Sequence, residues 1–422
     1  MNLTKLNNWR ELRLDEIFEI SRGGSPRPIK DFITELDDGY NWIKIGDTKN
    51  VDKYIYSTKQ KIIKEGLKKS VLVKEDDFIL SNSMSFGKPY IMKTTGCIHD
   101  GWLLMRRKSS DLSIDYMYYL LSSDVIKNQF KSKAAGSTVQ NLNIKLVATV
   151  RALIPTYSEQ QKIADILSTV DAKIDIIQQQ IDETLDLKKG LMQRLLTNGI
   201  GHTEFKDSPL GKIPKDWQTI PIFELRNLDD RYSFTGGPFG SDLKSEHYTS
   251  SGIKILQLQN IGEGKFIDKG IVFTSKEKAD DLISCNIYPD DIILAKMAPV
   301  ARCCKVPSTD ERYVMCSDGI RLSIDRKRFD NEFVFQALNS NYFRKEAESK
   351  STGTTRARIG LSDLKQIPIK IPNSIDEQKR IGDILSSVDK KLNVLGEKKT
   401  TYQELKKGLM QQLLTGKIRV KV

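Results

Sequence analysis

Two short segments of this sequence carry the residue types that contact nucleic acid. Residues 131–141 and 350–358 are rich in basic, hydroxyl and amide side chains. Lysine, arginine and hydroxyl groups bind phosphate, whereas arginine, glutamine and asparagine can form paired hydrogen bonds with base edges. The net charge of +12 and the pI of about 9.2 favour a densely negative partner, nucleic acid before an anionic membrane. We therefore predict one DNA-contacting segment in each half of the chain.

Further candidates for DNA contact lie in loop-like segments of the same two halves. Together with the two clusters, the predicted residues of the first half are Arg22, Ser25, Arg27, Lys131, Lys133, Ser137, Thr138, Gln140 and Asn141. Those of the second half are Lys244, Gln257, Gln259, Lys296, Arg302, Lys350, Thr354, Thr355, Arg356 and Arg358. Each one is equally well explained as a solvated surface residue, so the clusters carry more weight than their members.

The motifs of common nucleic-acid enzymes are absent from the sequence. The Gly-rich stretches 22–26 and 235–240 match neither the Walker pattern nor a GxGxxG turn, and we interpret them as loops. No Asn-Pro-Pro-Tyr or Asp-Pro-Pro-Tyr type motif of an amino-methyltransferase is present. Residues 346–350 superficially resemble a carboxylate–lysine nuclease signature, but we expect a surface helix there.

Metal-binding and nucleophilic sites also lack support. The doublets Asp76-Asp77 and Asp290-Asp291 each directly precede an apolar run, which indicates turn residues rather than metal ligands. The five cysteines include no CxxC pair, and we expect them to be reduced and mostly buried. The three histidines are scattered singly. We therefore expect no catalytic residue, metal or cofactor in this chain.

An internal repeat organises the sequence around these segments. Residues 159–197 align without a gap with residues 377–415 and are identical at 20 of 39 positions. Both copies begin with Glu-Gln and carry Leu-Lys-Lys-Gly-Leu-Met-Gln near the end. A duplication with a period of about half the chain predicts a pseudo-twofold object, because equivalent surfaces can pack on one another.

Each repeat has the pattern of a long helix. Apolar residues recur at alternating intervals of four and three, which is typical of a coiled-coil stripe. The predicted coiled-coil residues are Ile163, Leu167, Val170, Ile174, Ile177 and Ile181, then Ile381, Leu385, Val388, Leu392 and Leu395. A helix of about 40 residues would be about 60 Å long. Antiparallel packing would hold the globular regions at opposite ends, although the spacing is also compatible with parallel packing.

Helix boundaries and interruptions can be predicted from single residues. Ser158 and Ser374 are candidate N-caps, and Gly199 and Gly416 are candidate stops. The repeats also share an internal glycine, Gly190 or Gly408, where a break or a close helix crossing can occur because glycine weakens a helix.

The globular regions share an order of landmarks despite their low identity. Each has a tryptophan near its start, an Asp-Asp doublet before an apolar run, an Asp-Gly pair and a helical patch before its basic cluster. The duplication therefore covers the whole chain. We predict an α+β protein in which globular regions 1–157 and 199–373 alternate with helical regions 158–198 and 374–422.

This layout resembles the specificity (S) subunit of Type I restriction-modification systems, which alternates two target-recognition domains with two repeated helical regions. The resemblance covers nearly the whole chain. It is carried by residues 158–163 with 376–381, by the paired Leu-Lys-Lys-Gly-Leu-Met-Gln segments, and by the joint at residues 208–217.

The resemblance implies a sequence-specific, non-catalytic DNA-binding subunit. Each recognition domain would read one half of a bipartite, gapped site in double-stranded DNA, while the helical spacers set the gap and dock two modification (methyltransferase) subunits. S-adenosylmethionine, ATP and Mg²⁺ would belong to the modification and restriction (translocase/nuclease) subunits. We expect a cytoplasmic protein, because no run of about 18 apolar residues could span a bilayer and no signal peptide is evident.

Two other classes of function compete with this interpretation. A single-chain enzyme could both bind and modify nucleic acid, but the missing cofactor motifs count against it. A scaffold without nucleic acid could use the repeated helices to recruit partners, with an incidental basic charge. Salt-sensitive binding to duplex DNA that a methyltransferase subunit enhances would separate the first interpretation from both.

Overall fold

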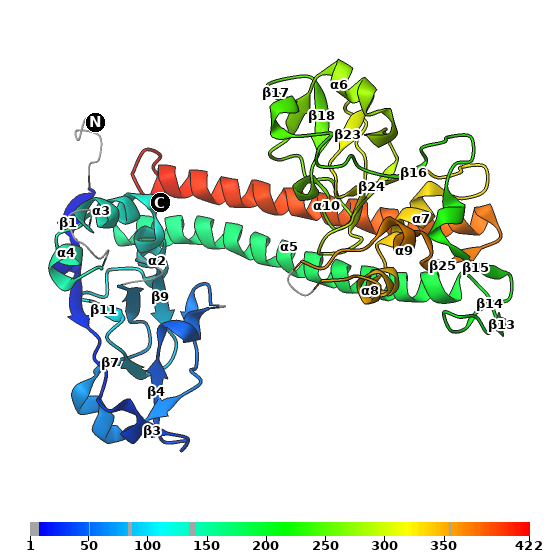
Figure 1. The fold of residues 1–422 in the computed structure, drawn as a ribbon. Helices are drawn as coiled ribbons and strands as arrows, with labels where there is room; N and C mark the ends of the chain where they lie inside the picture. Colours follow the sequence, from blue (N-terminus) through cyan, green and yellow to red (C-terminus); the bar gives the residue numbers. More distant parts are fainter. Residues whose placement is uncertain (1–7, 50, 83–86, 135–140, 354–355) are drawn as a thin grey trace. The chain divides into compact units, whose positions relative to one another are not determined.

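The chain divides into two compact units, each with one globular region and one half of each long helix (Figure 1). The first unit consists of residues 1–178 and 397–422, and the second of residues 179–396. The computed structural model describes residues 8–49, 51–82, 87–134, 141–353 and 356–422.

Two five-stranded sheets form most of the first globular region. Their strand orders are β3-β6-β4-β10-β7 and β2-β11-β8-β9-β5, and β1 pairs with β12 outside them. The strands are β1 (Arg10–Arg13), β2 (Phe18–Arg22), β3 (Ile33–Thr34), β4 (Tyr40–Ile43), β5 (Tyr54–Ile55), β6 (Lys61–Ile62), β7 (Val71–Val73), β8 (Phe78–Ser81), β9 (Pro89–Met92), β10 (Gly96–Ile98), β11 (Trp102–Arg107) and β12 (Arg151–Ile154). The helices are α1 (Leu14–Ile17), α2 (Ile114–Ser122), α3 (Asp124–Ala134) and α4 (Ile144–Ala148).

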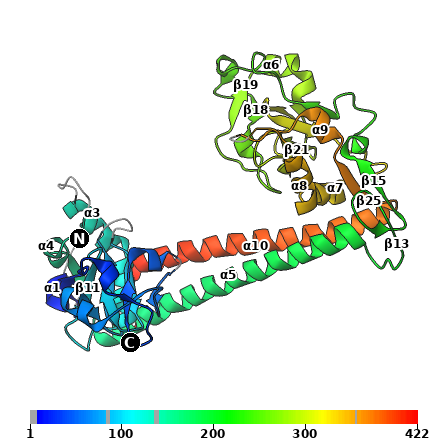
Figure 2. The same ribbon diagram turned by 60° about the horizontal axis from the view of Figure 1, so that its bottom comes forward.

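The second globular region repeats this plan with different strands. Its larger sheets have the orders β16-β24-β21-β22 and β17-β19-β18-β23-β20, beside the pairs β13-β14 and β15-β25. The strands are β13 (Phe205–Lys206), β14 (Ile213–Pro214), β15 (Trp217–Pro221), β16 (Phe234–Gly236), β17 (Tyr248–Thr249), β18 (Ile253–Leu256), β19 (Val272–Thr274), β20 (Asn286–Ile287), β21 (Ile292–Ala295), β22 (Cys303–Lys305), β23 (Tyr313–Met315), β24 (Gly319–Leu322) and β25 (Pro368–Pro372). The helices are α6 (Lys276–Asp281), α7 (Asn331–Leu338), α8 (Asn341–Ser349) and α9 (Leu361–Lys365). Figure 2 shows α7 and α8 together at one side of this region's sheets.

A fully buried strand in each region serves two hydrophobic cores. In β8, Phe78 and Leu80 pack into the core beneath α2, whereas Ile79 packs with Trp102 on the opposite face. In β21, Ile293 likewise faces away from its neighbours Ile292 and Leu294. Side chains alternate across a strand, so a continuous apolar run can join two layers.

The cysteines contribute to these cores. All five are free, and all except Cys316 are buried. The prediction that they are reduced and mostly buried is confirmed.

The aspartate doublets lie in the turns that lead into these strands. Asp76 and Asp290 both have a φ of 65°, in the left-handed region that favours turn residues. The second aspartate of each doublet pairs with arginine on a neighbouring strand, Asp77 with Arg106 and Asp291 with Arg321, each at 2.6 Å. The interpretation of both doublets as turn residues is confirmed.

The predicted apolar stripes are the buried faces of the long helices α5 (Tyr157–Asn198) and α10 (Ile375–Leu413). In α5, Ile163, Leu167, Val170 and Ile177 are buried, and Ile174 and Ile181 are partly exposed. The α10 stripe is buried at Ile381, Leu385, Val388 and Leu395, with Leu392 partly exposed.

Among the helices of the described residues, none has the length and apolar character that a membrane span needs.

Within each unit the two helices pack antiparallel. In the first unit Asp171 near the start of α5 pairs with Lys406 near the end of α10 at 2.5 Å. In the second unit Lys188 near the end of α5 pairs with Asp389 near the start of α10 at 2.6 Å. These ion pairs occupy equivalent positions of the repeat with the helices exchanged. The antiparallel prediction is therefore confirmed, and the parallel alternative is wrong.

The helix boundaries correct part of the prediction. Ser158 is not the N-cap of α5, because the helix already begins at Tyr157. The cap is Thr156, whose Oγ1 accepts the Glu159 N–H at 3.4 Å. Ser374 does cap α10, since its Oγ accepts the Glu377 N–H at 3.4 Å. Gly199, with a φ of +65°, directly follows the last residue of α5 and confirms the predicted stop.

Neither internal glycine interrupts its helix. Both helices continue through Gly190 and Gly408, and a Cβ at either position would meet nothing within 4 Å. The expectation of a break or a close crossing is therefore wrong, because burial of the flanking apolar stripe outweighs the weak helix propensity of one residue.

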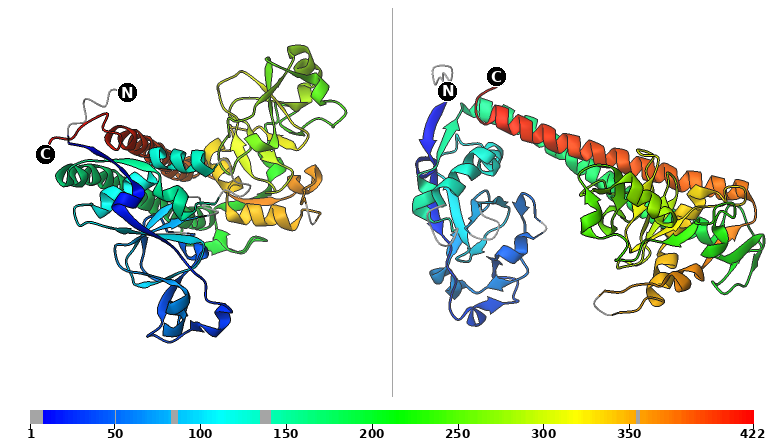
Figure 3. Two further views of the ribbon diagram at one scale, coloured as in Figure 1. Left: turned by 90° about the vertical axis from the view of Figure 1, so that its left-hand side faces the viewer. Right: turned by 45° about the horizontal axis from the view of Figure 1, so that its top comes forward.

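The glutamate at the start of the first repeat joins the helix to the globular region. Glu159 is buried and accepts the indole N–H of Trp9 at 3.2 Å. Arg419, just beyond α10, donates to both Glu159 oxygens at 2.8 and 2.9 Å. Figure 3 shows the end of α10 beside the beginning of α5. Burial by itself would raise the pKa of Glu159, but these donors hold it below the ordinary value.

The second repeat builds the same joint with one different donor. Glu377 accepts the indole N–H of Trp217 at 3.2 Å and lies 2.8 Å from His202 Nε2. The adjoining glutamines also match. Gln160 and Gln378 each accept a loop N–H at 2.8 Å, from Ser113 and Asp330 respectively. The Glu-Gln pair is repeated because each copy fixes one globular region to its helix.

We predict that Glu159→Gln lowers the free energy of unfolding of the first unit by about 1–3 kcal/mol at pH 7. The carboxylate has a depressed pKa, so its stabilisation is present above the ordinary glutamate pKa of about 4.3 and disappears as pH falls through the lower, folded-state value. The difference between wild type and variant should therefore shrink at pH 3. Urea unfolding followed by tryptophan fluorescence at both pH values measures it.

Glu404→Gln is the matched control, because this glutamate is exposed on α10 in the same unit. It should change stability by less than about 0.5 kcal/mol. Equal effects of the two substitutions, or an effect of Glu159→Gln that persists unchanged at pH 3, would contradict the assigned role of the joint.

Candidate nucleic-acid interface

The loop after β2 in the first globular region is held against an Asp-Gly turn. A Cβ on Gly23 would lie 2.1 Å from the His99 carbonyl oxygen, so only glycine fits there. Ser25 Oγ donates to the Asp100 carboxylate at 2.9 Å, which lowers the pKa of Asp100. Arg22 Nε donates to the Asp100 carbonyl at 3.3 Å. Two predicted DNA contacts therefore lie side by side on one organised turn.

The corresponding loop of the second region is fixed in the same way. The Gly237 N–H donates to the Gly319 carbonyl at 2.9 Å, and a Cβ on Gly237 would lie 1.7 Å from the Cys316 carbonyl oxygen. The loop then presents Phe239, which is 83% exposed. Our sequence analysis did not nominate this aromatic residue. Its place after a Gly-Gly-Pro run was the available signal.

Lys296 and Arg358 meet at the Asp-Gly turn of the second region. Lys296 Nζ donates to the Ser317 carbonyl at 2.9 Å, and Arg358 pairs with Asp318 at 3.0 Å. Burial, and then the neighbouring Arg358, lower the pKa of Lys296. The arginine side chain remains about half exposed, at 54%. The structure thus brings together two residues that lie 62 positions apart in the sequence.

Arg302 has a structural role that its sequence context did not reveal. Its guanidinium donates to the carbonyls of Ile261 at 2.6 Å, Leu258 at 2.8 Å and Pro299 at 3.5 Å, so each of its three nitrogens is engaged. Gln257 and Gln259 belong to the same turn and share a 3.0 Å hydrogen bond. This geometry assigns Arg302 to support of the turn and does not favour its nomination as a DNA contact.

The other nominated residues that the structure describes are exposed and remain predicted DNA contacts. They are Arg27, Lys131, Lys133, Asn141, Lys244, Lys350 and Arg356. Five more lie outside the described residues, namely Ser137, Thr138, Gln140, Thr354 and Thr355.

The aspartates of the two Asp-Gly turns position neighbouring donors, a role that we did not predict from the sequence. The Asp100 carboxylate accepts a hydrogen bond from Ser25 Oγ, and Asp318 forms an ion pair with Arg358. A carboxylate would repel a DNA phosphate, so it acts here by positioning neighbouring donors. The repeated Asp-Gly order was the signal in the sequence, but the residues that it binds are distant along the chain.

No candidate metal cluster accompanies these loops in the described part of the chain. No group of three or more His, Cys, Asp and Glu side chains there is placed to hold a metal ion. The nuclease-like stretch that begins at Glu346 lies in α8, the helix expected from the sequence.

A second candidate surface consists of apolar residues at equivalent positions on the two long helices. Ile176 corresponds to Val394 and Leu187 to Leu405, and these four residues are between 47% and 52% exposed. They lie off the buried stripe. The repeat therefore preserves exposed apolar side chains as well as the helix contacts.

Comparison with known proteins agrees with this architecture. The model of a family described as the Type I restriction modification DNA specificity domain matches residues 7–186 and 214–407. The Type I restriction enzyme MjaVIII specificity subunit of Methanocaldococcus jannaschii is 27% identical over 420 residues, covering 98% of this chain and 94% of that protein. The MjaIX specificity subunit of the same organism is 21% identical with the same coverage. A crystal structure of the Type I restriction-modification S subunit from M. genitalium matches with a TM-score of 0.58, 16% identity and 98% coverage of both chains.

We predict that Gly237→Ala destabilises the second unit by about 1–3 kcal/mol, because the new methyl group would collide with a backbone carbonyl. Gly240→Ala in the same loop is the control, since its Cβ would meet nothing within 4 Å. That substitution should change stability by less than about 0.5 kcal/mol. Urea unfolding of both variants checks the difference, and similar midpoints would show that the loop is not anchored at Gly237.

Proposed function

Because this chain belongs to the Type I restriction modification DNA specificity family, we propose that it reads a bipartite, gapped site in double-stranded DNA. Each globular region recognises one half of the site, and the long helices set the gap. The chain is a specificity component and not an enzyme, so the methyl transfer that marks the site is carried out by partner subunits.

One observation supports this proposal most strongly. Two dissimilar globular regions are attached to the helices by the same joint, Glu159 with Trp9 and Glu377 with Trp217. The same Glu–Trp joint thus attaches two different globular regions, which we call heads. This arrangement suits a protein that must present two different DNA-reading surfaces at a defined separation. The basic segments occupy equivalent places in the two heads, so both heads would meet duplex DNA through similar loops.

The helices also provide a repeated surface for two copies of a modification subunit. The exposed apolar residues Ile176 and Leu187 have counterparts in Val394 and Leu405. A repeated surface matches two identical partners, because each copy can make the same contacts. Singly exposed apolar residues are common on protein surfaces, so it is the recurrence of these residues at equivalent positions of the repeat that supports an interface.

The remaining components of the reaction belong to the partners in this proposal. The modification subunits would hold S-adenosylmethionine, and restriction subunits would supply ATP-driven translocation and Mg²⁺-dependent cleavage. The complex would act on DNA in the cytoplasm.

Mapping of adenine methylation in the source cell, with and without this gene, tests the proposal directly. We expect one gapped, asymmetric motif to lose its methylation when the gene is deleted. Unchanged methylation in a strain that demonstrably expresses the gene would contradict it.

We predict that Arg356→Gln weakens binding of the assembled methyltransferase complex to its own site by about 10- to 100-fold. The residue is exposed in the basic segment of the second head, so its loss removes a contact without removing packing. Fluorescence anisotropy at several salt concentrations measures the effect. The matched control Lys276→Gln removes a positive charge from exposed α6 and should leave affinity within about twofold.

We also predict that the gap depends on the length of the helices. Four residues inserted after Gln179 add about 6 Å to α5, which corresponds to one or two base pairs. The methylated motif of the variant should keep both half-sites and gain a longer gap. Methylation mapping reads the motif, and an active variant with an unchanged gap would contradict the spacer role.

A further inference from the structure

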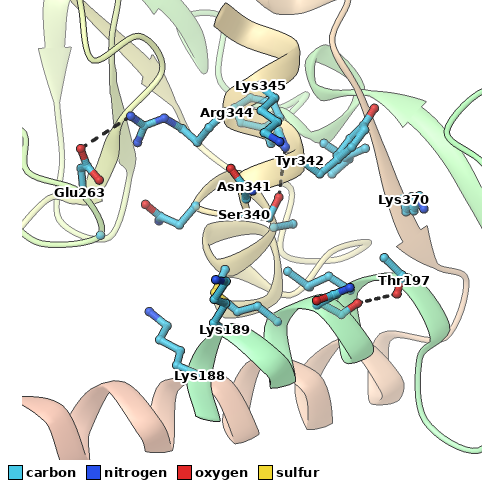
Figure 4. Close-up of a pocket in the computed structure, with 18 of the residues that line it drawn as sticks. Lys188, Lys189, Thr197, Glu263, Ser340, Asn341, Tyr342, Arg344, Lys345 and Lys370 are labelled. Carbon is cyan, nitrogen blue, oxygen red and sulfur yellow. Dashed lines mark hydrogen bonds and ion pairs between the residues drawn. The ribbon is translucent and has the colours of Figure 1, made fainter. Parts of the chain in front are cut away.

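A pocket of about 970 Å³ lies within the second unit, between the last part of α5 and helix α8 (Figure 4). Its apolar lining includes Met192 and Leu196 of α5, Phe343 of α8 and Ile369 of β25. Lys188, Lys189, Arg344, Lys345 and Lys370 also line it, against the two carboxylates of Glu263 and Glu348. The pocket thus combines apolar walls with an excess of positive charge.

Two buried donors of residues that line this pocket have no acceptor among the described residues. Tyr342 Oη and Arg344 Nε are buried without a hydrogen-bond partner among the described residues. The contact of Arg344 with Glu263 is long, at 3.9 Å. Burial lowers the pKa of Lys370, whose ammonium lies 5.9 Å from the Tyr342 ring. Unpaired buried donors are costly, so this arrangement suits an acceptor supplied by another molecule.

Lys188 and Lys189 differ in their availability. Lys188 is paired with Asp389 in the helix packing described above. Lys189 is exposed on the next position of α5 and faces the pocket region in Figure 4. A ligand would therefore meet Lys189 and the cations of α8 and β25, while Lys188 holds the helices together.

The pocket is lined on one side by α5, its helix side, and on the other by α8 and β25, its head side. The first unit repeats residues of the helix side but not those of the head side. The start of α8 matches the start of α3 in the first head. Ser340 Oγ accepts the Phe343 N–H in α8, and Ser123 Oγ accepts the Ile126 N–H in α3. The two helices therefore align with an offset of 217 residues. The same offset relates the strands β12 and β25.

At aligned positions the head-side residues differ in chemistry. Tyr342, Lys345 and Lys370 correspond to Val125, Asn128 and Leu153. On the helix side, Lys189, Met192 and Gln193 are repeated as Lys407, Met410 and Gln411. Arg344 and Glu348 of the second head correspond to Lys127 and Lys131, so both heads carry basic charge on this helix. The buried Tyr342 hydroxyl and the lysines at positions 345 and 370 are specific to the second head.

We propose that this pocket binds an acidic, amphipathic segment of a partner protein, and that such a segment docks once per complex, at the second head only. This inference rests on the proposed function, which supplies the partner subunits. Apolar side chains of the segment fill the space beside Met192 and Phe343, and its carboxylates accept from Tyr342, Arg344 and the lysines. Two identical partners on the repeated helices would thereby become distinguishable.

The apolar walls favour a protein segment over the DNA backbone. Phosphates are bound by exposed basic and hydroxyl groups and gain nothing from a cavity lined by Leu196, Phe343 and Ile369. An amphipathic segment with acidic residues uses both parts of the lining, as do helices that bind in grooves.

Photo-crosslinking in the assembled complex tests the proposal. Benzoylphenylalanine replaces Asn341, which is exposed at the pocket, in the full chain purified with its modification subunits and bound to duplex DNA. We expect a crosslink to a peptide of a partner protein, with no more than one partner molecule crosslinked per complex. The matched control carries benzoylphenylalanine at Asp124, the aligned position of the first head, and should crosslink at least about tenfold less.

A triple variant tests the chemistry of the pocket. Tyr342→Val, Lys345→Asn and Lys370→Leu introduce the residues of the first head and should lower the crosslink from position 341 by at least about tenfold. Lys276→Asn with Lys212→Leu removes the same charge from exposed positions and should leave the yield unchanged. If the triple variant is unstable to urea, Lys345→Asn alone replaces it, because this lysine is exposed.

The outcomes separate this inference from the function on which it rests. A crosslink to DNA, an equal crosslink from position 124, or no crosslink in a complex that still methylates its gapped site would overturn the inference alone. Failure of the chain to assemble with any modification subunit would remove the proposed function and the inference together.

Discussion

The architecture depends on a buried carboxylate at the start of each long helix. An ionised side chain in such a place is costly unless hydrogen-bond donors surround it. Glu159 and Glu377 each meet an indole N–H from the first strand region of their own globular region, and a second donor from the segment that follows the other helix. The helix N-terminus adds a favourable electrostatic contribution for negative charge. One side chain thus fixes three separate parts of the chain relative to one another within its unit.

That joint explains how the two globular regions could diverge while the helices stayed alike. Within each unit the globular region contacts its helix pair through the Glu-Gln pair, the tryptophan and the apolar stripe, and these are the repeated residues. The loops around Asp100 and Asp318 are not bound by these contacts. Loops that are separate from the joint can change without disturbing it. The separation also fits a specificity subunit that leaves chemistry to its partners.

The second head also differs from the first at the pocket beside α8. Tyr342, Lys345 and Lys370 add polar and basic groups where the first head has Val125, Asn128 and Leu153. On the helix side, Lys189, Met192 and Gln193 are repeated as Lys407, Met410 and Gln411. Because the head side of the pocket differs while much of its helix side is repeated, the two units can present different surfaces to their partners.

The order of residues alone was sufficient for the features that depend on local pattern. The heptad spacing predicted both helices and most of their buried positions, such as Ile163, Leu167 and Ile177, because burial on a helix follows from periodicity. The repeat predicted that the two helices are equivalent. The spacing did not decide between parallel and antiparallel packing. The ion pairs of Asp171 with Lys406 and Lys188 with Asp389 decided it, since their partners are distant in sequence. The low helix propensity of glycine led us to expect a break at Gly190 and Gly408. Both helices continue there, because burial of the apolar stripe outweighs the helix propensity of one residue.

The candidate interface shows the same division between local pattern and long-range contact. Clusters of lysine, arginine and hydroxyl residues were recognisable from composition, but the assignment of individual side chains was not. Arg302 resembles Arg358 in the sequence, yet its donors are engaged by the carbonyls of Leu258 and Ile261. Only the fold brings Arg358 to Asp318 and leaves its side chain exposed beside Lys296. The chain's local chemistry predicts which residues could contact DNA. Only its long-range packing decides which of their donors are already engaged within the protein, as for Arg302 and in the ion pair of Arg358 with Asp318, because those partners are distant along the chain.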